Sequence, residues 1–463
     1  MAYFLGVDLG TSYFKVGLFD EIGTLKGLSR QALLKETPVP GHCEVAVSVF
    51  WRLLRDSVAD VLRQAGLAAG EVTGLSYSSQ ANTFILLGRA DRALTPLILW
   101  TDMRGEPLPG DLWGFTYHAG YGRRTGFTGM TGEWAAAKWH WFQRNRPKLW
   151  SDVRSIMTIS DYFTYALTGE RVGDAGTAAL LGLYDLTARE WWPAALAAFD
   201  IERTHLSRPL RPGTPCGRTS AEARRLLGLP PGIPFAVGSL DHHMAALGSG
   251  LGETADVSIS TGTVLAALTR VRSVAPQPNC YHGPDFDDTG FFRVALDSMG
   301  AGQLEDYQTR FAPSLSIEEL IGLAATASDG LPPRSWQTDL TPQEHGRHMR
   351  YLLEKIAASQ CALVQRVTDG AGAQRIVATG GGARSAVWVQ MKADMLGVPV
   401  STPFSPERAC LGAAMVASVA AKVYPDLTSA SAGMLQPGQN YLPNPKNVQR
   451  YAPWLGKVSH EVP

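Results

Sequence analysis

The chain has 463 residues, of which 45% are hydrophobic and 18% are charged. This length exceeds what one hydrophobic core usually holds, so we expect two large domains, and the composition excludes a disordered or fibrous protein. Lys plus Arg and Asp plus Glu number 42 each, which excludes the strong positive charge that is typical of proteins that bind nucleic acid or anionic membranes.

The cysteines and the apolar runs indicate a cellular compartment. The five cysteines are scattered without a Cys-x-x-Cys pair, which argues against a disulfide framework or a zinc knuckle and indicates free thiols. Residues 1–10 lack a basic start, and no uncharged apolar run approaches the roughly 18 residues that a membrane span needs. We therefore expect a cytoplasmic protein that neither enters nor binds a membrane.

Strand and helix patterns alternate along the first half of the chain. Short strands with glycine turns between them are predicted at residues 3–7, 13–19 and 24–32, then at 74–78, 84–87 and 97–100. Helical periodicity marks residues 47–64, 134–145 and 161–167. Segments 184–192 and 207–219 are broken by turn residues, and we expect them to cross the surface.

The second half repeats this plan. Strands are predicted at 235–237, 257–260, 264–269 and 375–378, and helices at 244–247, 348–367 and 385–396. A glycine turn joins the strand pair near 260, as one does near residue 10, although the residues themselves barely match. The chain is therefore predicted to be an α/β protein with two domains, residues 1–247 and 248–463.

The first glycine turn has the residues of a phosphate site. Phosphoryl transfer needs backbone amides, a metal and cations around the phosphate, and a base on the accepting hydroxyl. Gly10 lets a phosphate approach the backbone, and Thr11 and Ser12 can donate hydrogen bonds to it. Lys15 supplies charge, and Asp8 can hold hydrated magnesium. The alternative is an ordinary turn between two strands.

Two further glycine turns occur in the second half. Thr261-Gly262-Thr263 offers the same kind of amide-rich turn, although a plain hairpin has the same pattern. The run 380–382 consists of three glycines between a strand and a helix, which lets a flat or charged ligand lie against the backbone, whereas a flexible loop is the alternative. No GxxxxGK[ST] segment occurs, so a P-loop is excluded as the phosphate site.

Asp241 is the candidate general base. It follows a buried-looking strand, where one carboxylate could accept a hydroxyl proton, although an Asp that caps the next helix has the same pattern. His242 and His243 could touch substrate, although packed or solvated histidines are common at strand ends. His345 and His348 are spaced HxxH without the further ligands that would complete a metal site, and we expect them on a solvated helix face.

Trp100 is the candidate wall of a sugar site. An indole face can cover the apolar side of a sugar, and Trp100 ends an apolar strand. Asp102 and Arg104 follow it, and we expect them to form an ion pair that braces the loop. The aromatic-rich segment 138–142 is expected to lie in the core.

Taken in order, these segments resemble the FGGY carbohydrate kinases, which belong to the superfamily of actin, hexokinase and the Hsp70 ATPase. The resemblance covers nearly the whole chain, and seven motifs in the right order carry it. They lie at residues 6–15, 78–82, 99–104, 138–145, 238–241, 260–263, and 380–385 together with 409–414.

The resemblance implies two actin-like, ribonuclease H-like domains that flank a cleft for ATP and sugar. It implies that the protein uses ATP and Mg²⁺ to phosphorylate a hydroxyl of a small sugar, with Asp241 as the catalytic base. The first candidate for the sugar is a ketose such as a pentulose. The positions that match its substrate segments are Gln80, Ala81, Asn82, Trp100, Asp241 and His242. The positions that match its nucleotide motifs are Gly10, Thr11, Ser12, Lys15, Gly262, Thr263, Gly381, Gly382, Ala383 and Ser385, with Asp8 for the metal.

Departures from the family pattern leave the sugar open. Ala81 and Asn82 replace a larger pair that is usual in xylulose or glycerol kinases, and the stretch 303–345 is short. Glu133, Ala135 and the pair 354–355 depart from the two family signatures. The alternatives are a glycerol or other polyol kinase, and a degenerate regulator that binds nucleotide and sugar without phosphorylating it. The expected partner is a small molecule, and the oligomeric state stays open, a homodimer included.

Overall fold

The computed structural model describes residues 1–117, 119–262, 264–334, 340–405 and 407–458. Its contacts divide the chain into two compact units, each made of three segments. Unit 1 comprises Met1–Gly248, Val271–Phe292 and Ser405–Gln436. Unit 2 comprises Ser249–Arg270, Arg293–Phe404 and Pro437–Pro463. Two segments beyond residue 248 therefore pack with unit 1, and the division into domains at residue 247 stays a prediction.

Unit 1 is built on a mixed seven-stranded sheet in the order β13-β14-β5-β1-β2-β3, with β15 paired to β5. The strands are β1 (Tyr3–Leu9), β2 (Tyr13–Asp20), β3 (Leu25–Ala32), β5 (Val72–Ser79), β13 (Pro215–Arg218), β14 (Pro234–Ala236) and β15 (Ser239–Leu240). β1, β2 and β3 form the antiparallel meander that the sequence predicts. β5 runs parallel to β1, so the ends of β1 and β5 that carry Asp8 and Ser78 lie side by side.

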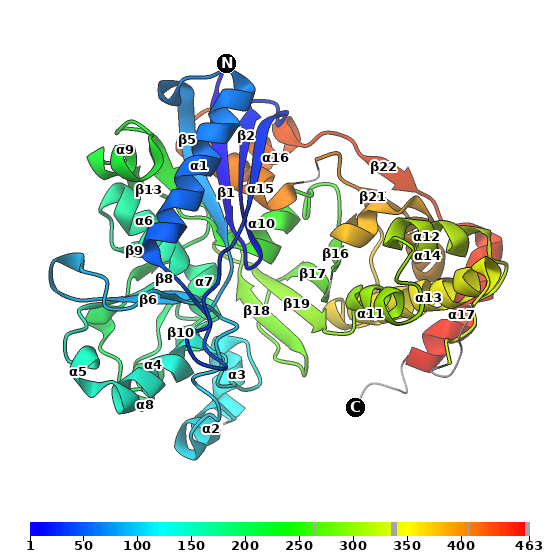
Figure 1. Ribbon diagram of the computed structural model, residues 1–463, viewed down its shortest axis with the longest axis horizontal. Helices are drawn as coiled ribbons and strands as arrows, with labels where there is room; N and C mark the ends of the chain where they lie inside the picture. The colour runs from blue at the N-terminus through cyan, green and yellow to red at the C-terminus, as the bar shows by residue number, and fades with distance from the viewer. Residues whose placement is uncertain (118, 263, 335–339, 406, 459–463) are drawn as a thin grey trace. The chain divides into compact units, whose positions relative to one another are not determined.

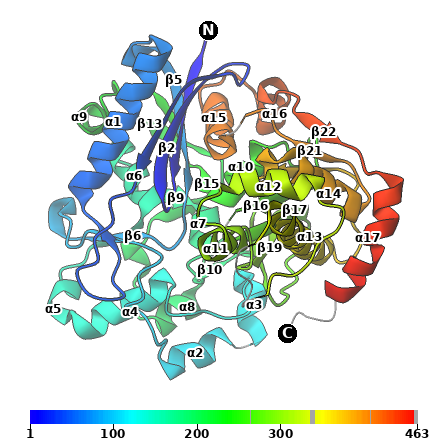
Figure 2. The ribbon, with the colours of Figure 1, turned by 45° about the vertical axis from the view of Figure 1, so that its right-hand side comes forward.

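Helices cover both faces of this sheet (Figure 1, Figure 2). One face packs against α1 (Val47–Ala65), α6 (Ile159–Thr168) and α9 (Ala221–Leu227), and the other against α10 (Asp241–Leu247), α15 (Arg408–Ala420) and α16 (Leu427–Met434). Alternation along β1 explains the two cores, because Leu5 and Val7 face the first group while Phe4 faces the second. Gly6 lets α15 approach, since a Cβ there would lie 1.9 Å from the carbonyl oxygen of Cys410.

A smaller sheet and several short elements complete unit 1. The sheet has the order β4-β7-β6-β8. Its strands are β4 (Glu44–Val45), β7 (Leu97–Ile98), β6 (Phe84–Leu87) and β8 (Ser155–Thr158). The short helices are α2 (Gly110–Thr116), α3 (Ala119–Thr125), α4 (Ala135–Asn145), α5 (Pro147–Trp150), α7 (Ala175–Ala179) and α8 (Pro193–Ala198). The remaining strands are β9 (Val172–Asp174), β10 (Tyr184–Asp185), β11 (Glu190–Trp191), β12 (Arg208–Leu210) and β18 (Cys280–Pro284).

The expected surface crossing at 184–192 is wrong. β10 and β11 form a hairpin whose Tyr184, Leu186 and Trp191 are buried. The apolar residues flank a short polar segment, so residues 187–190, the first residue of β11 included, reach solvent while residues 184–186 and Trp191 are buried. Segment 207–219 does lie near the surface for most of its length.

Unit 2 repeats the arrangement of strands found in unit 1. Its strands follow the order β19-β17-β16-β20-β21-β22, in which β16 pairs antiparallel with β17 and parallel with β20, as β1 does with β2 and β5. The strands are β16 (Val257–Thr261), β17 (Leu265–Val271), β19 (Phe291–Asp297), β20 (Ile376–Thr379), β21 (Val400–Thr402) and β22 (Gln439–Tyr441). The helices are α11 (Gly302–Phe311), α12 (Ile317–Thr326), α13 (Pro342–Val367), α14 (Ala386–Leu396) and α17 (Pro445–Val458).

Helix α13 begins six residues before the predicted start. Thr341 and Glu344 form a capping box, and a proline in the first turn suits a helix start. The expectation that His345 and His348 lie on a solvated face is wrong, since both rings are buried and contact the hydroxyl oxygen of Tyr307 at 2.9 and 3.2 Å. Burial lowers the pKa of both histidines. No helix in the described part of the chain is long and apolar enough to cross a membrane.

Candidate active site

Asp8 and Lys15 meet at the first glycine turn of unit 1. The antiparallel register of β1 and β2 places them opposite each other, with Lys15 Nζ 3.3 Å from Asp8 Oδ2. Ser78 on β5 donates to Asp8 Oδ1 at 2.9 Å. Lys15 Nζ also lies 3.2 Å from Glu407 Oε2, a partner that the sequence did not single out. The turn therefore carries one cation between two carboxylates.

The charges of this group depend on one another. Burial raises the pKa of Asp8, as does the charge of Asp241, and these effects outweigh the lowering by Lys15 and Ser78. Burial lowers the pKa of Lys15, but the charges of Asp8 and Glu407 outweigh it, so the net shift is upward. Lys15 is therefore a permanent cation at neutral pH, which is the state that a phosphate ligand requires.

The glycine turn itself is closely held. A Cβ on Gly10 would lie 2.7 Å from the carbonyl oxygen of Tyr13, so a larger residue would force the turn to change. Gln80 Nε2 donates to the carbonyl oxygen of Gly10 at 3.2 Å. Thr11 Oγ1 donates to Gln80 Oε1 at 3.4 Å and accepts from the indole nitrogen of Trp100 at 2.7 Å. The turn is thus tied to two of the predicted substrate residues. Ser12 holds the far side, because its carbonyl oxygen accepts from the backbone N–H of residue 33.

Gln80 and Asn82 have different surroundings. Gln80 is buried, and its side-chain oxygen also accepts from Thr83 Oγ1 at 3.0 Å, so the oxygen has two partners inside the protein and the nitrogen has one. Asn82 has a φ of +57°, and its Oδ1 accepts from the backbone N–H of Ala135 at 3.0 Å. Among the described residues nothing accepts from Asn82 Nδ2. Asn82 can therefore offer a donor to a ligand, with the half-buried Ala81 beside it, while Gln80 braces the turn.

Trp100 is fixed by its backbone. Trp100 is 38% exposed, its backbone N–H donates to Thr83 Oγ1 at 3.1 Å, and its carbonyl oxygen accepts from Lys138 Nζ at 2.8 Å. Lys138 also donates to the carbonyl oxygen of Leu99 at 2.8 Å. Burial lowers the pKa of Lys138 to about 7. The expected burial of segment 138–142 is confirmed for Lys138, Trp139 and Phe142. In the sequence, the position of Lys138 as a single lysine within an aromatic helix is the feature that could indicate its contact with the carbonyl oxygens of Leu99 and Trp100.

Asp102 and Arg104 form the expected brace. Arg104 Nε lies 2.8 Å from Asp102 Oδ1, and its other arm donates to Glu44 Oε1 at 2.5 Å. His42, Glu44 and Asp102 are spaced as a metal site would be, and no other such group occurs in the described parts of the chain. The guanidinium of Arg104 pairs with both carboxylates, so we interpret this cluster as a structural ion-pair network.

Asp241 is the first residue of α10, and its carboxylate is held on one side. Asp241 Oδ1 accepts from the backbone N–H of His242 at 2.7 Å and from His242 Nδ1 at 2.6 Å. Leu240 takes the N-cap position, so Asp241 is not the capping residue. Partial burial raises the pKa of Asp241, but the charge and the hydrogen bonds of His242 outweigh it and leave the pKa below its usual value. The carboxylate is 43% exposed and ionised at neutral pH.

The neighbours of Asp241 include the buried side chain of His243 and the aromatic ring of Tyr281. His243 is fully buried, its Nδ1 lies 3.0 Å from Ser239 Oγ, and its ring centre lies 4.4 Å from that of Phe292. Burial lowers the pKa of His243 to about 3, so its ring is neutral. Burial and the charge of Asp241 raise the pKa of Tyr281, whose ring stacks on Phe127 with 5.5 Å between centres. Sequence reasoning missed this aromatic pair, because it forms between distant segments.

The two glycine segments of unit 2 pack against each other. Gly380 has a φ of +80°, and a Cβ there would lie 2.5 Å from the carbonyl oxygen of Thr261. A Cβ on Gly382 would lie 2.8 Å from Thr261 Cβ. Gly381 and Ala383 belong to the same short 3₁₀ turn, Gly381–Arg384. Ser385 caps α14 by accepting from the N–H of Trp388 at 3.3 Å. Gly262 accepts from the N–H of residue 301 at 2.7 Å, and Thr263 lies outside the described residues.

Comparison with known proteins decides the family. Residues 3–248 match the N-terminal domain of the FGGY family of carbohydrate kinases, and residues 300–421 match its C-terminal domain. The chain belongs to the FGGY family. It is a carbohydrate kinase, whose substrates are small sugars or polyols, and its fold is that of two actin-like domains.

The relatives of this FGGY kinase match along nearly their whole length. The chain is 24% identical to the L-xylulose/3-keto-L-gulonate kinase of Escherichia coli K12, over 99% of this chain and 96% of that protein. It is 26% identical to the xylulose kinase of Lactococcus lactis, over 97% and 94% of the two chains. The ligand-bound xylulose kinase from Lactobacillus acidophilus has a TM-score of 0.87 at 21% identity, over 99% and 97% of the two chains.

Proposed function

We propose that this FGGY kinase transfers the γ-phosphate of ATP to a hydroxyl of a ketose, a pentulose in the first place, with Asp241 as the general base. The geometry of Asp241 carries the proposal. One carboxylate oxygen is fixed by two hydrogen bonds from His242, while the carboxylate as a whole is ionised and 43% exposed. The second oxygen is therefore the one that can accept the proton of a substrate hydroxyl.

The first glycine turn fits the phosphate end of ATP. Gly10 and Thr11 are half-buried, Ser12 is exposed, and Lys15 is a cation beside them. Asp8 fits hydrated Mg²⁺, because each of its oxygens already has one protein partner and it can hold a metal through water. Bound Mg²⁺ supplies the charge that neutralises the phosphate groups. In unit 2 we assign nucleotide binding to Gly262, Thr263, Gly381, Gly382, Ala383 and Ser385.

Trp100 and Asn82 fit a neutral polyhydroxy compound. The exposed part of the indole can cover the apolar edge of a carbon chain, and Asn82 Nδ2 is a free donor for a hydroxyl. Lys138 lies beside Trp100, and its amine already donates to two carbonyl oxygens. This supports an uncharged acceptor, since a buried anion without a cation is costly to desolvate. The names of the two relatives reported above include a xylulose, which supports a pentulose, whereas the first name also includes 3-keto-L-gulonate, a sugar acid, and other relatives are named autoinducer-2 kinases.

An acceptor screen tests the proposal. Purified protein with ATP and Mg²⁺ is offered pentuloses, hexuloses, polyols and sugar acids, and ADP release is measured for each. We expect the highest kcat/KM for a pentulose. A preference for glycerol or another polyol, or for a sugar acid, would contradict the proposal that the acceptor is a ketose. Nucleotide and sugar binding without ADP release for any acceptor would instead identify a regulator.

A further inference from the structure

Lys392 is a buried amine beneath the second glycine turn, and the proposed chemistry does not use it. It lies on α14 and is fully buried. Its Nζ donates to Thr261 Oγ1 at 2.6 Å and lies 4.6 Å from the ring centre of Trp388. Thr261 is the last residue of β16 and directly precedes Gly262. The amine therefore contacts the residue that directly precedes the turn to which we assign nucleotide binding.

A chain of hydrogen bonds fixes this position. Thr261 Oγ1 donates to Gln360 Oε1 at 3.3 Å, and Gln360 Nε2 donates to the carbonyl oxygen of Ala266 on β17 at 2.8 Å. The hydroxyl proton of Thr261 is thus committed to Gln360, so Thr261 accepts from Lys392. The amine, the hydroxyl and the amide together join α14 and α13 to both strands of the β16–β17 hairpin.

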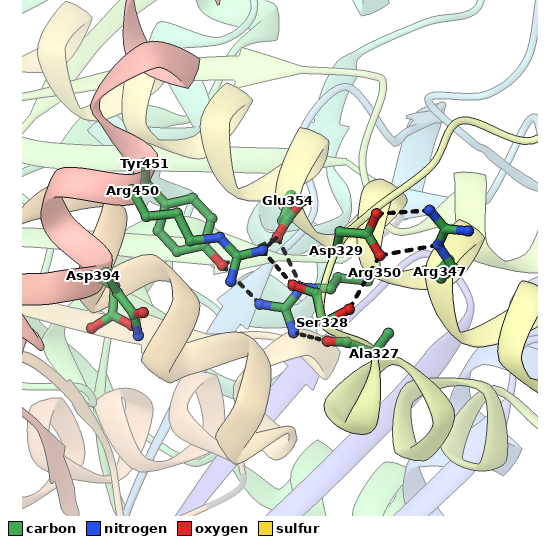
Figure 3. A network of polar contacts seen from close by, with 10 residues as sticks. Ala327, Ser328, Asp329, Arg347, Arg350, Glu354, Asp394, Arg450 and Tyr451 are labelled. Atoms are coloured by element: carbon green, nitrogen blue, oxygen red, sulfur yellow. Dashed lines mark hydrogen bonds and ion pairs between the residues drawn. The ribbon is translucent and has the colours of Figure 1, made fainter.

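No acidic group neutralises Lys392 among the described residues. The two carboxylates nearest to it in sequence on α13 and α14 are used elsewhere. Glu354, which Figure 3 shows within a network of arginines, accepts from Arg350 Nε at 3.0 Å. Asp394 accepts from Asn447 Nδ2 at 2.7 Å. Lys392 is therefore a buried amine whose contacts are a hydroxyl and an indole face. The indole attracts a cation, but no carboxylate offsets the cost of burying the charge in the free protein.

The electrostatics agree with this geometry. Burial lowers the pKa of Lys392 to about 7. The titratable group that acts on it is the Cys361 thiol on α13, and burial raises the pKa of that thiol to about 12, so it carries no charge at neutral pH. An anion near the amine would favour its charged form. A phosphate at Gly262 would be such an anion.

We propose that Lys392 is a positioning residue of the β16–β17 turn that gains a proton, and with it a charge, when a phosphate-bearing ligand binds at Gly262. This inference rests on the proposed nucleotide-binding role of unit 2. It adds to that role a buried charge that forms only in the complex, so that nucleotide binding and proton uptake are linked. The free protein then avoids a permanent buried charge, and the bound phosphate gains a cation.

Calorimetry with ADP tests the link, because ADP binds without turnover. The binding heat is measured in buffers of different ionisation enthalpy, and the slope gives the protons taken up per ADP. At about pH 8, an amine with a pKa of about 7 is about nine-tenths neutral. Wild type should therefore take up roughly 0.9 proton more than Lys392→Met, and near pH 6 the difference should shrink to about 0.1.

Two further variants separate charge from structure. Lys392→Gln keeps a donor for Thr261 but has no titratable amine, so it should bind ADP without the extra uptake. Lys138→Met removes a second lysine that is buried and has a pKa of about 7, and which contacts the carbonyl oxygens of Leu99 and Trp100. Its proton uptake should match that of wild type. If wild type and both Lys392 variants bind ADP and take up the same number of protons per ADP, this inference is wrong while the proposed function stands. Failure of wild type to bind ADP would overturn the proposed function together with it.

Discussion

Asp161 makes the stability of unit 1 depend on pH. It lies in the first turn of α6, where it forms a capping box with Thr158, and its side chain is buried. A Cβ on Gly173 would lie 1.8 Å from Asp161 Oδ1, so the backbone of β9 closes directly over the carboxyl group. Burial raises the pKa of Asp161 to about 7, and the charge of Asp174 adds to this effect. The carboxyl group is therefore protonated in the folded protein under conditions in which it ionises in the unfolded chain.

The sign and the size of the effect follow from this difference. The folded state binds more protons than the unfolded state between the usual value of 3.8 and about 7. The contribution of the Asp161 carboxyl group to the free energy of unfolding is therefore fully present below its pKa in the unfolded chain. It is lost as pH rises through its pKa in the folded protein. A shift of about three units corresponds to about 4 kcal/mol. Asp161→Asn removes the titration, and its amide oxygen can still accept the N–H of Thr158.

Urea denaturation at a series of pH values measures the effect. The free energy of unfolding of Asp161→Asn minus that of wild type should increase by about 4 kcal/mol between about pH 4 and pH 8. Asp56→Asn is the matched control, because Asp56 is an exposed aspartate on α1 and its replacement should leave the profile of wild type unchanged. A difference between Asp161→Asn and wild type that does not change with pH would refute the reasoning.

Two predictions concern the candidate site. Asp8→Ala should lower turnover strongly and change the Mg²⁺ concentration that half-maximal activity requires, whereas an unchanged Mg²⁺ titration would remove Asp8 from the metal site. Asn82→Asp keeps the oxygen that accepts from Ala135 and tolerates the positive φ, but it loses the Nδ2 donor. The KM for the sugar should rise by about tenfold while the KM for ATP stays the same, and unchanged sugar kinetics would contradict the placement of the acceptor.

Local patterns were enough to predict most of the fold. The meander β1 to β3 follows from alternating apolar residues with glycine turns, and α1 follows from its helical periodicity. The repeated strand plan in unit 2 was also predicted, because each pair of strands encloses a glycine turn. Apolar periodicity alone does not indicate the start of α13, which the capping box of Thr341 and Glu344 determines.

The contacts of the site could be predicted only in part. Asp8 and Lys15 are close in sequence, and the glycine turn between two strands places them opposite each other. Glu407 joins them from a distant segment of the chain, and no local pattern indicates that contact. The burial of His345 depends in the same way on Tyr307, which belongs to another helix. Pairings between distant segments are set by tertiary packing, which the sequence of either segment alone does not contain.

Asp241→Asn tests the central claim most directly. Phosphoryl transfer to the best acceptor is measured in a single turnover by rapid quench, and calorimetry checks that ADP and the sugar still bind. The account predicts that binding is kept and that the transfer rate falls by about 10² to 10⁴, which is the usual contribution of a general base. A transfer rate close to that of wild type in the folded variant would contradict the assignment of Asp241 as the base.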